Sequence, residues 1–449
     1  MPLRKVCLWS EGETLTSLAQ DIVVKKGSRH EASFYLLDLD DVCRKVQLWR
    51  KTLPRVVPHY AVKCNSDLAI LRTLADQGVN FDCATKREIE LVLSLGVSPS
   101  RIVYAHTVKN PSYIQYARHN HVVRMTFDNT SELIKIKENF EDAELILRLK
   151  VVENDMYHMC DKFGCAPKNA GKLLEKAKDL GLKVIGLSFH VGCNNQKTNV
   201  YHSALAECKR AELLAESLGF NISLIDIGGG YQGQIGTEHT FIRTAAEITG
   251  ALEEFFPPEK YCIISEPGTF FVASSMVLAA KVVGKRVLNG VSQLYVNDST
   301  YMSFMLAFFD DSHLNIQLLG EKTIHGIADE GDDLMPTRVW GNTCDGVDVI
   351  AKLCHLPYVR VGDWLLFHNM GAYSTVTETE FNSFEHPHKY YRASDARLIQ
   401  RARDALVAGL NKLRRDDWAD DGISPGRFCY HRSNSVNNPV FNDIQRSIA

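Results

Sequence analysis

The chain is 449 residues long, with 45% apolar and 23% charged residues, and its 51 basic and 54 acidic residues leave a net charge of −3. This composition is typical of a folded globular protein and excludes intrinsic disorder over most of the length. The balanced charge gives no electrostatic reason to expect binding to nucleic acid or to an anionic membrane surface.

The start of the chain and its cysteines bear on the cellular compartment. The apolar stretch after Met1 is too short for the core of a signal peptide. The longest nearly apolar run, residues 269–280, is shorter than the roughly 20 residues that span a membrane. The 12 cysteines are scattered and form no CxxC pair. We therefore expect a cytoplasmic protein with reduced thiols, without a disulfide framework and without a metal site.

Residues 33–266 alternate short β-branched or apolar runs with stretches of helical periodicity. The predicted strands are 59–63, 79–84, 102–105, 122–127, 144–150, 183–190, 222–227 and 261–265, and the predicted helices include 67–77, 86–95, 170–180, 200–218 and 240–256. Gly96, Gly181 and Gly219 stand where helix C-caps belong. The pattern predicts an α/β fold with a (β/α)8 barrel over residues 33–273. A doubly wound sheet is the alternative, which periodicity alone does not separate.

The pattern changes after about residue 274, where helical periodicity fades. Strand-like runs occur at 276–283, 294–297, 317–319, 337–340, 358–361 and 364–367. They predict a mainly β domain over residues 274–416, with a hairpin turn at 361–363. Residues 319–335 are rich in Gly, Asp and Glu and are predicted to form a mobile loop. Residues 417–449 have the composition of a disordered tail.

The predicted barrel strands bring chemically useful residues to one rim, because active sites of barrels lie at the carboxyl ends of the strands. These residues are Lys63, Asp82, Arg148, His190, Gly228, Gly229, Gly230 and Glu266. Taken singly, each has a structural explanation, since a lysine after a strand is usually a solvated strand end and three glycines can simply make a tight turn. Their occurrence together favours a functional site.

This set suits one cofactor. Three glycines after a strand let backbone N–H groups approach a phosphate closely. A lysine can form a Schiff base, a glutamate can hold a proton on a pyridine nitrogen, and an imidazole can stack on the ring. These features together indicate pyridoxal 5'-phosphate. Metal catalysis fits less well, because no close cluster of His, Asp and Glu is visible.

Several motifs occur in an order that resembles the eukaryotic ornithine decarboxylase family, over about residues 33–390. They are PHYAVKCN at 58–65, FDCA at 81–84, SFHVG at 188–192, DIGGG at 226–230, SEPG at 265–268, WGNTCDG at 340–346, GDW at 362–364 and NMGAY at 369–373. The resemblance implies a fold-type III enzyme, with an alanine-racemase-like barrel and a β domain to which residues 1–32 contribute. It also implies a homodimer whose active sites lie at the interface.

The resemblance implies roles for individual barrel residues. Lys63 corresponds to the Schiff-base lysine, with Asp82 close to it. His190 corresponds to the residue stacked on the cofactor ring, Glu266 to the partner of the pyridine nitrogen, and Arg148 to an arginine that supports the cofactor region. The positions that correspond to phosphate contacts are Cys193, Gly228, Gly229, Gly230, Gly268, Thr269 and Tyr373.

Residues of the β domain correspond to a part of the site that is donated across the dimer interface. In the family, the cysteine matching Cys344 returns a proton to the substrate carbon after carbon dioxide leaves, and the aspartate matching Asp345 holds the distal ammonium of the substrate. Asp310 resembles a second aspartate for that ammonium, and Phe381 an aromatic wall. A buried ammonium without a counter-charge would be very costly, so such carboxylates select a basic amino acid.

Three positions depart from the family pattern. Thr269 stands where the family has a phosphate-binding arginine, Cys193 where it usually has serine, and Phe309 where it has tyrosine. A charged hydrogen bond contributes roughly 1.5–3 kcal/mol. We therefore expect weaker cofactor binding than the family pattern would give.

Three functions are compatible with the sequence. The first is decarboxylation of L-ornithine to putrescine and carbon dioxide in polyamine biosynthesis. The second is an inactive paralogue similar to the antizyme inhibitors, which bind antizyme; the third is decarboxylation of another amino acid. Retention of the residues that carry the chemistry favours an enzyme. Residues 110–138, which match the antizyme-binding stretch of the family, carry mixed charges and leave antizyme binding open.

Overall fold

The structure is a computed structural model that describes residues 6–8, 13–26, 32–151, 159–192, 199–308, 314–319 and 334–419. The predicted mobile loop is therefore largely outside the described residues, as is the predicted tail from residue 420 on. Within the described part of the chain, no helix is long and apolar enough to cross a membrane.

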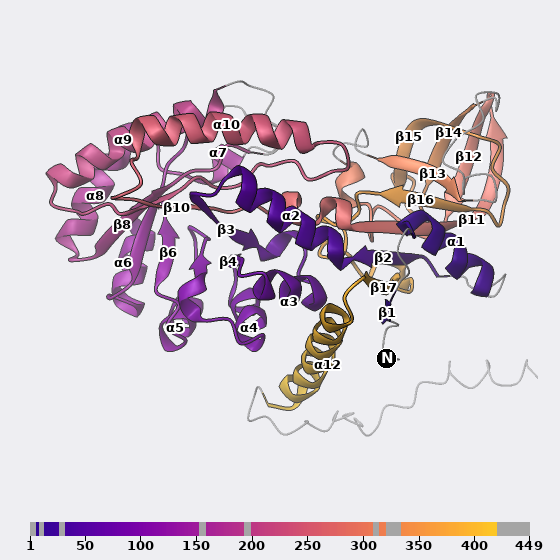
Figure 1. The fold of residues 1–449 in the computed structure, drawn as a ribbon, viewed down its shortest axis with the longest axis horizontal. Helices are drawn as coiled ribbons and strands as arrows, with labels where there is room; N and C mark the ends of the chain where they lie inside the picture. Colours follow the sequence, from indigo (N-terminus) through magenta and orange to yellow (C-terminus); the bar gives the residue numbers. More distant parts are fainter. Residues whose placement is uncertain are drawn as a thin grey trace, which may run out of the picture. The chain divides into compact units, whose positions relative to one another are not determined.

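Eight parallel strands close into a barrel, as the alternating pattern predicted (Figure 1). Around the ring they are β3 (Val56–Ala61), β4 (Asn80–Cys83), β5 (Ile102–Tyr104), β6 (Arg124–Phe127), β7 (Glu144–Arg148), β8 (Lys183–Ser188), β9 (Leu224–Asp226) and β10 (Cys262–Ser265). Strand β10 pairs with both β9 and β3. This closure excludes the doubly wound sheet.

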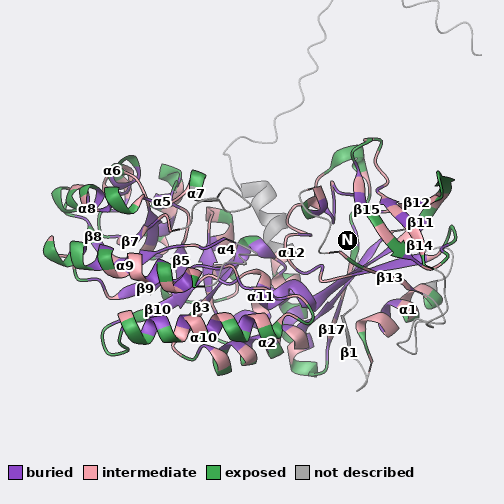
Figure 2. Ribbon diagram, turned by 90° about the horizontal axis from the view of Figure 1, so that it is seen from above, coloured by how far each residue is buried: buried purple, intermediate pink, exposed green. Residues whose placement is uncertain are grey.

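The barrel strands alternate with helices that bury one face against them (Figure 2). The helices are α2 (Leu39–Thr52), α3 (Leu68–Asp76), α4 (Lys86–Ser94), α5 (Pro111–His119), α6 (Thr130–Asn139), α7 (Met159–Lys162), α8 (Ala170–Asp179), α9 (Val200–Ser217), α10 (Glu238–Phe255) and α11 (Thr269–Val272). Gly96, Gly181 and Gly219 directly follow the C-caps of α4, α8 and α9 with positive φ angles, which confirms that interpretation.

Nine strands of the described chain form the sheet of the second, mainly β domain. The path runs β1 (Val6–Leu8), β17 (His388–Ala393), β2 (Phe34–Asp38), β11 (Met276–Leu288), β12 (Val291–Val296), β14 (Met335–Trp340) and β15 (Val349–Leu356), with β16 (Trp364–His368) pairing β11 and β13 (Asn315–Leu319). Helix α1 (Leu15–Lys26) buries Leu18 and Ala19 in the cluster that includes Phe34 of this sheet. Strand β2 follows residue 33 and belongs to the sheet, not to the barrel.

One predicted strand of the sheet domain is absent, and β1, β2, β15 and β17 were not among the predicted strands. Residues 358–361 form no strand, because the backbone turns here: the N–H of Arg360 donates to Asp363 Oδ2 at 2.7 Å, and Gly362 has a φ of +99°. The strand next to this segment is β15, which pairs with β14. The turn leads from β15 into β16, which do not pair with each other, so it is not a hairpin.

The end of the described chain is helical. Helix α12 (Ala396–Ala419) includes residues 417–419, which were predicted to belong to the tail. Ile399, Ala402 and Ala405 are buried at intervals of three residues, so one apolar stripe has packing partners.

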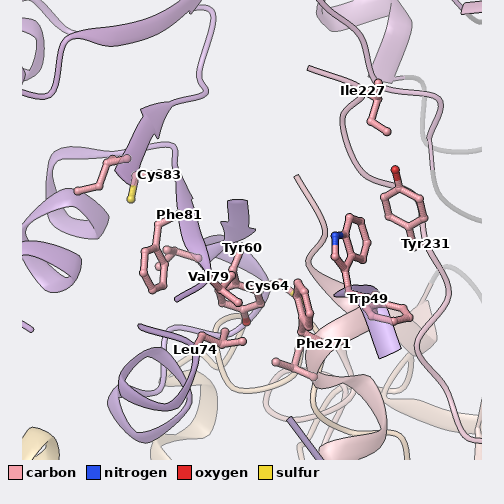
Figure 3. Packing of buried hydrophobic residues seen from close by; sticks show 14 of the residues in the cluster. Trp49, Tyr60, Cys64, Leu74, Val79, Phe81, Cys83, Ile227, Tyr231 and Phe271 are labelled. Carbon is pink, nitrogen blue, oxygen red and sulfur yellow. The ribbon is translucent and has the colours of Figure 1, made fainter. Parts of the chain in front are cut away.

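An aromatic cluster supports the rim of the barrel (Figure 3). Trp49 of α2 meets the ring of Tyr231 at 5.1 Å and that of Phe271 at 5.7 Å between centroids. Its Nε1–H donates to the carbonyl of Val56 at 2.9 Å. Because Tyr231 follows the three glycines and Phe271 belongs to α11, this cluster fixes the backbone of both segments at the mouth of the barrel.

Candidate active site

The lumen of the barrel is built in layers. Val103, Ile146, Leu224 and Ile264 form a small apolar cluster of their own. Side chains alternate along a strand, so the residues two positions beyond also face the lumen. These are Arg148, Asp226 and Glu266. Asp82 pairs with Val103 across β4 and β5, and Ser188 pairs with both Arg148 and Asp226. A polar layer therefore lies directly above the apolar one.

Lys63 extends from η2 (Val62–Cys64), immediately after β3, into this polar layer. Its Nζ contacts the carboxylate of Asp82, which is fully buried, while the lysine side chain is 43% exposed. Burial alone would lower the pKa of Lys63, but the carboxylates of Asp82 and Glu266 outweigh it and raise that pKa. Burial raises the pKa of Asp82 to about 7 against the effect of Lys63. The raised pKa means that Lys63 holds its proton beside the buried carboxylate.

A cavity of about 340 Å³ opens above this layer, within the size range of small-molecule sites. Seven of the residues singled out from the sequence line it: Lys63, His190, Gly230, Glu266, Gly268, Thr269 and Tyr373. The remaining wall includes side chains from the sheet domain that the sequence did not single out, among them Ser303, Phe304 and His368. The cavity therefore lies where the barrel mouth meets the sheet domain.

The three glycines form a backbone cradle at the cavity edge. Gly228 and Gly230 have φ angles of +65° and +111°. A Cβ at Gly228 would lie 2.2 Å from the carbonyl oxygen of Phe189, and one at Gly230 would lie 2.4 Å from that of Gly192. Only glycine fits at either position, because backbone carbonyl groups of the neighbouring segment occupy the place of a side chain.

Two further residues frame the cradle. His190 accepts the N–H of Gly192 at its Nδ1 at 3.0 Å, which fixes the orientation of the ring. Tyr373 has a φ of +53°, and its N–H donates to the carbonyl of Cys64 at 2.9 Å. This bond places Tyr373 beside the segment that carries Lys63. Both residues line the cavity.

Arg148 faces the lumen from β7, with its guanidinium 5.1 Å from the ring centroid of Phe163. It contributes to the electrostatics of Asp82, Asp226 and Glu266, in each case favouring the carboxylate. Arg148 lies beneath the cavity and does not line its wall. This place suits a residue that supports the cofactor region more than one that contacts a bound cofactor directly.

The predicted residues of the sheet domain gather in a second group. The N–H of Cys344 donates to Asn382 Oδ1 at 2.9 Å. The hydroxyl of Tyr301 donates to Asp345, which lowers the pKa of that carboxyl group, and the Tyr301 ring lies 4.5 Å from the ring of Phe381. Cys344, Asp345 and Phe381 are thus close to one another, but none of them lines the cavity that holds Lys63. Cys193, Phe309 and Asp310 lie outside the described residues.

A buried carboxylate holds the loop of this second group. Asp348 accepts the N–H and hydroxyl of Thr300 at 2.9 and 2.7 Å, and those of Thr343 at 3.1 and 2.6 Å. Gly341 packs so tightly against it that a Cβ would lie 2.2 Å from Asp348 Oδ2. Four hydrogen bonds to one buried acid fix the backbone on which Cys344 and Asp345 stand.

Two residues of the polar layer were quoted in motifs but were given no role. Ser188 and Asp226 both face the lumen and are buried at 4% and 0% exposure. The alternation of side chains along a strand is the signal that could have identified them. Each lies an even number of residues from a position on the same strand whose side chain faces the lumen.

The residues present fit pyridoxal phosphate. Gly230 brings backbone without a side chain to the cavity wall, and Lys63 lines the same cavity beside a carboxyl group. Among the described residues, two further buried oxygens of the polar layer have no hydrogen-bond partner: Asp82 Oδ1 and Ser188 Oγ. Buried polar atoms are normally satisfied, so unsatisfied ones below a cavity indicate a polar group that binds there.

A (β/α)8 barrel that presents a strand-end lysine and a glycine cradle to one cavity, with a β domain covering it, has the architecture of the barrel-type pyridoxal phosphate enzymes. Residues 39–273 match the family model described as "Pyridoxal-dependent decarboxylase, pyridoxal binding domain". The chain therefore belongs to the pyridoxal-dependent decarboxylases, a family of amino-acid decarboxylases that use pyridoxal phosphate. This confirms the resemblance and the cofactor inferred from the sequence.

Curated relatives include both enzymes and a related inhibitor. Ornithine decarboxylase of Rattus norvegicus is 38% identical over 396 residues, covering 83% of this chain and 84% of the relative. Antizyme inhibitor 2 of Xenopus laevis is 38% identical over 425 residues, covering 91% of each.

Among solved structures, the arginine decarboxylase of Paramecium bursaria Chlorella virus, bound to agmatine, has a TM-score of 0.79 and 37% identity, covering 84% of this chain and all of that one. The lysine/ornithine decarboxylase of Vibrio vulnificus, complexed with putrescine, has a TM-score of 0.74 and 31% identity, covering 86% of this chain and 99% of that one.

Proposed function

We propose that the protein decarboxylates L-ornithine to putrescine and carbon dioxide, as a step of polyamine biosynthesis. The observation that carries the proposal is the cavity that joins Lys63, Glu266 and Gly230. The similarity to ornithine decarboxylases over most of both chains supports the choice of substrate.

When bound, pyridoxal phosphate supplies a conjugated cationic ring that accepts the electron pair left behind when carbon dioxide departs. The chain's residues have the following roles in our proposal. Lys63 attaches the cofactor through its amine once Nζ has lost its proton, and Asp82 holds that amine in place. Glu266 holds a proton at the ring nitrogen, and His190 packs against the ring. Phosphate contacts come from the glycine cradle, Gly268, Thr269 and Tyr373, with Cys193 as a further contact.

The second group supplies substrate selection and proton return. Asp345, half-buried and held by Tyr301, binds the distal ammonium of the substrate together with Asp310, and Phe381 forms an apolar wall. The thiol of Cys344 donates a proton to the substrate carbon after carbon dioxide has left. Because this group does not line its own chain's cavity, we propose that it serves the cavity of a second copy, so that the active form is a homodimer.

The proposal is tested with the purified protein and a panel of substrates. Carbon dioxide release is measured from ornithine, lysine, arginine and leucine, with pyridoxal phosphate absent and at saturation. We expect the highest kcat/KM for ornithine and dependence on added cofactor. Faster release from arginine or leucine would replace the proposed substrate while leaving the decarboxylase assignment intact.

An inactive, antizyme-binding paralogue is the second candidate. Its support is the similarity to antizyme inhibitor 2 over 91% of both chains, together with threonine at position 269. The same assay discriminates, with purified antizyme as a binding probe. Antizyme binding without carbon dioxide release from any of the four amino acids, at saturating cofactor, would favour this candidate.

Thr269 gives a specific prediction about cofactor affinity. It lines the cavity, and the phosphate that we place there carries about −1.5 to −2 charges at neutral pH. Thr269→Arg should tighten binding of pyridoxal phosphate by about tenfold or more, since a charged hydrogen bond contributes roughly 1.5–3 kcal/mol. Turnover at saturating cofactor should change little. A fluorescence titration of the cofactor measures the dissociation constant.

Thr269→Met is the matched control, because it adds comparable length without charge. It should bind the cofactor no more tightly than the unmodified protein. If the arginine and methionine variants have the same dissociation constant, Thr269 does not face the phosphate.

A further inference from the structure

We infer that Asp226 is a positioning residue that acts through Glu266. The two carboxyl groups hold one proton between them in the cofactor-free protein, and Glu266 gives up that proton to the cofactor's ring nitrogen on binding. The inference rests on the proposed role of Glu266 and adds to it the origin of the proton.

The geometry joins the two residues. Strands β9 and β10 are neighbours, with Asp226 in register with Ile264, and the N–H of Glu266 donates to the carbonyl of Gly228 at 2.7 Å. Asp226 Oδ1 accepts the N–H of Gly228 at 2.9 Å, so this oxygen is fixed against the cradle. Both side chains face the lumen, and Glu266 in addition lines the cavity. Asp226 is therefore enclosed directly below Glu266.

The second oxygen of Asp226 meets no ordinary donor. Oδ2 is buried and accepts no N–H or hydroxyl of the described residues. The carboxyl group of Asp226 is instead within hydrogen-bonding reach of the carboxyl group of Glu266. A buried carboxylate oxygen without a hydrogen bond is costly. The leading charged neighbour of Glu266 is Asp226. A proton held between these carboxyl groups removes both the unsatisfied oxygen and the repulsion between two anions.

The charges of the whole layer lead to the same result. Its carboxyl groups are Asp82, Asp226 and Glu266, and its cations are Lys63 and Arg148. Lys63 is paired with Asp82, so one cation remains for two acids. Burial raises the pKa of Asp226 to about 6, and burial together with Asp226 raises the pKa of Glu266 well above its ordinary value. Two carboxyl groups that interact this strongly titrate together, and the pair keeps one of its protons.

The proton count balances without solvent. The pair changes from one negative charge to two when a Glu266 oxygen releases the proton, and the ring nitrogen changes from neutral to one positive charge. Arg148 and the N–H of Gly228 then stabilise the second anion on Asp226. Cofactor binding thus protonates the ring nitrogen with no net proton uptake at that atom.

The test counts protons taken up from solvent when pyridoxal phosphate binds. Isothermal titration calorimetry in buffers of different ionisation enthalpy is done at a mildly alkaline pH where the free cofactor's ring nitrogen is unprotonated. Asp226→Asn keeps an acceptor for the Gly228 N–H and donates an amide N–H to Glu266, so Glu266 is ionised before binding. We expect this variant to take up about one more proton per site than the unmodified protein.

Ser188→Ala is the matched control, because it removes a buried polar group from the same layer without changing its charge. It should show the proton uptake of the unmodified protein. Equal uptake by the unmodified protein and a well-folded Asp226→Asn variant would overturn the inference. All other proton transfers on binding are common to the variants and cancel in the difference.

A second measurement needs no cofactor. The infrared C=O stretch of a protonated carboxyl group should be present in the cofactor-free protein and in Ser188→Ala, and should weaken in Asp226→Asn, or in Glu266→Gln if the first variant fails to fold. An unchanged band in the folded variant would overturn the shared proton. If the unmodified protein binds no cofactor, the proposed function fails, and the infrared result still decides the question of the shared proton.

Discussion

Replacing Lys63 by alanine is expected to abolish carbon dioxide release, with a loss of about three orders of magnitude or more. Lys63 is the lysine that lines the cavity, and its Nζ contacts Asp82 next to Glu266. Without it, no amine is available to attach the cofactor, and the absorption band of lysine-bound pyridoxal phosphate should be absent. Decarboxylation rates and the absorption spectrum measure the two effects.

Lys63→Arg separates the covalent role from the electrostatic one. Arginine retains a positive charge beside Asp82 but does not form the bond to the cofactor. We expect it to be as inactive as alanine and to have a higher melting temperature than Lys63→Ala, which leaves Asp82 buried without its cation. Appreciable activity in either variant would contradict the assignment of Lys63.

Mixing two inactive variants should restore activity. Lys63→Ala and Cys344→Ala damage the two separate residue groups of the structure, the cavity and the loop held by Asp348. In a mixed dimer, one site combines an intact Lys63 with an intact Cys344 from the other subunit. Random exchange of equal amounts makes half of the dimers mixed, each with one working site of two, so about one quarter of full activity should return.

The control for this experiment mixes Lys63→Ala with Lys63→Arg, which leaves no intact cavity in any dimer and should stay inactive. Subunit exchange is verified by mass spectrometry of differently tagged chains. If exchange is complete and the first mixture remains inactive, the two groups do not form one shared site.

The fold was predictable in the part of the chain where strand-like and helical segments alternate regularly. The barrel strands alternate regularly with helices, and glycines mark the ends of α4, α8 and α9. In the sheet domain the signal is weaker, since β15 carries Lys352 and His355 among its apolar residues, and only pairing with β14 identifies it as a strand. The apolar residues at 358–361 are held instead by a turn that closes on the side chain of Asp363.

Strand order predicted which barrel residues come together, and the separate place of Cys344 and Asp345 was implied only by the family resemblance. Strand ends identify Lys63, Asp82, His190 and Glu266, because parallel strands of a barrel share one rim. Asp226 has no such signal beyond its parity on β9. That Cys344, Asp345 and Phe381 stand apart from the cavity follows from the path of the sheet, which no local pattern encodes.

The junction between barrel and sheet has a consequence for the mechanics of turnover. The segment 369–373 runs beside α11 and the start of β11: Met370 donates its N–H to Met276, and Gly371 donates to Ala273, at 2.9 and 3.1 Å. A Cβ at Gly371 would lie 1.6 Å from the carbonyl of Val272, so no larger residue allows this approach. Thr269 and Tyr373 stand on the two bonded segments. Bending at the junction would break these bonds, so they hold the spacing of the two residues against a hinge motion between barrel and sheet.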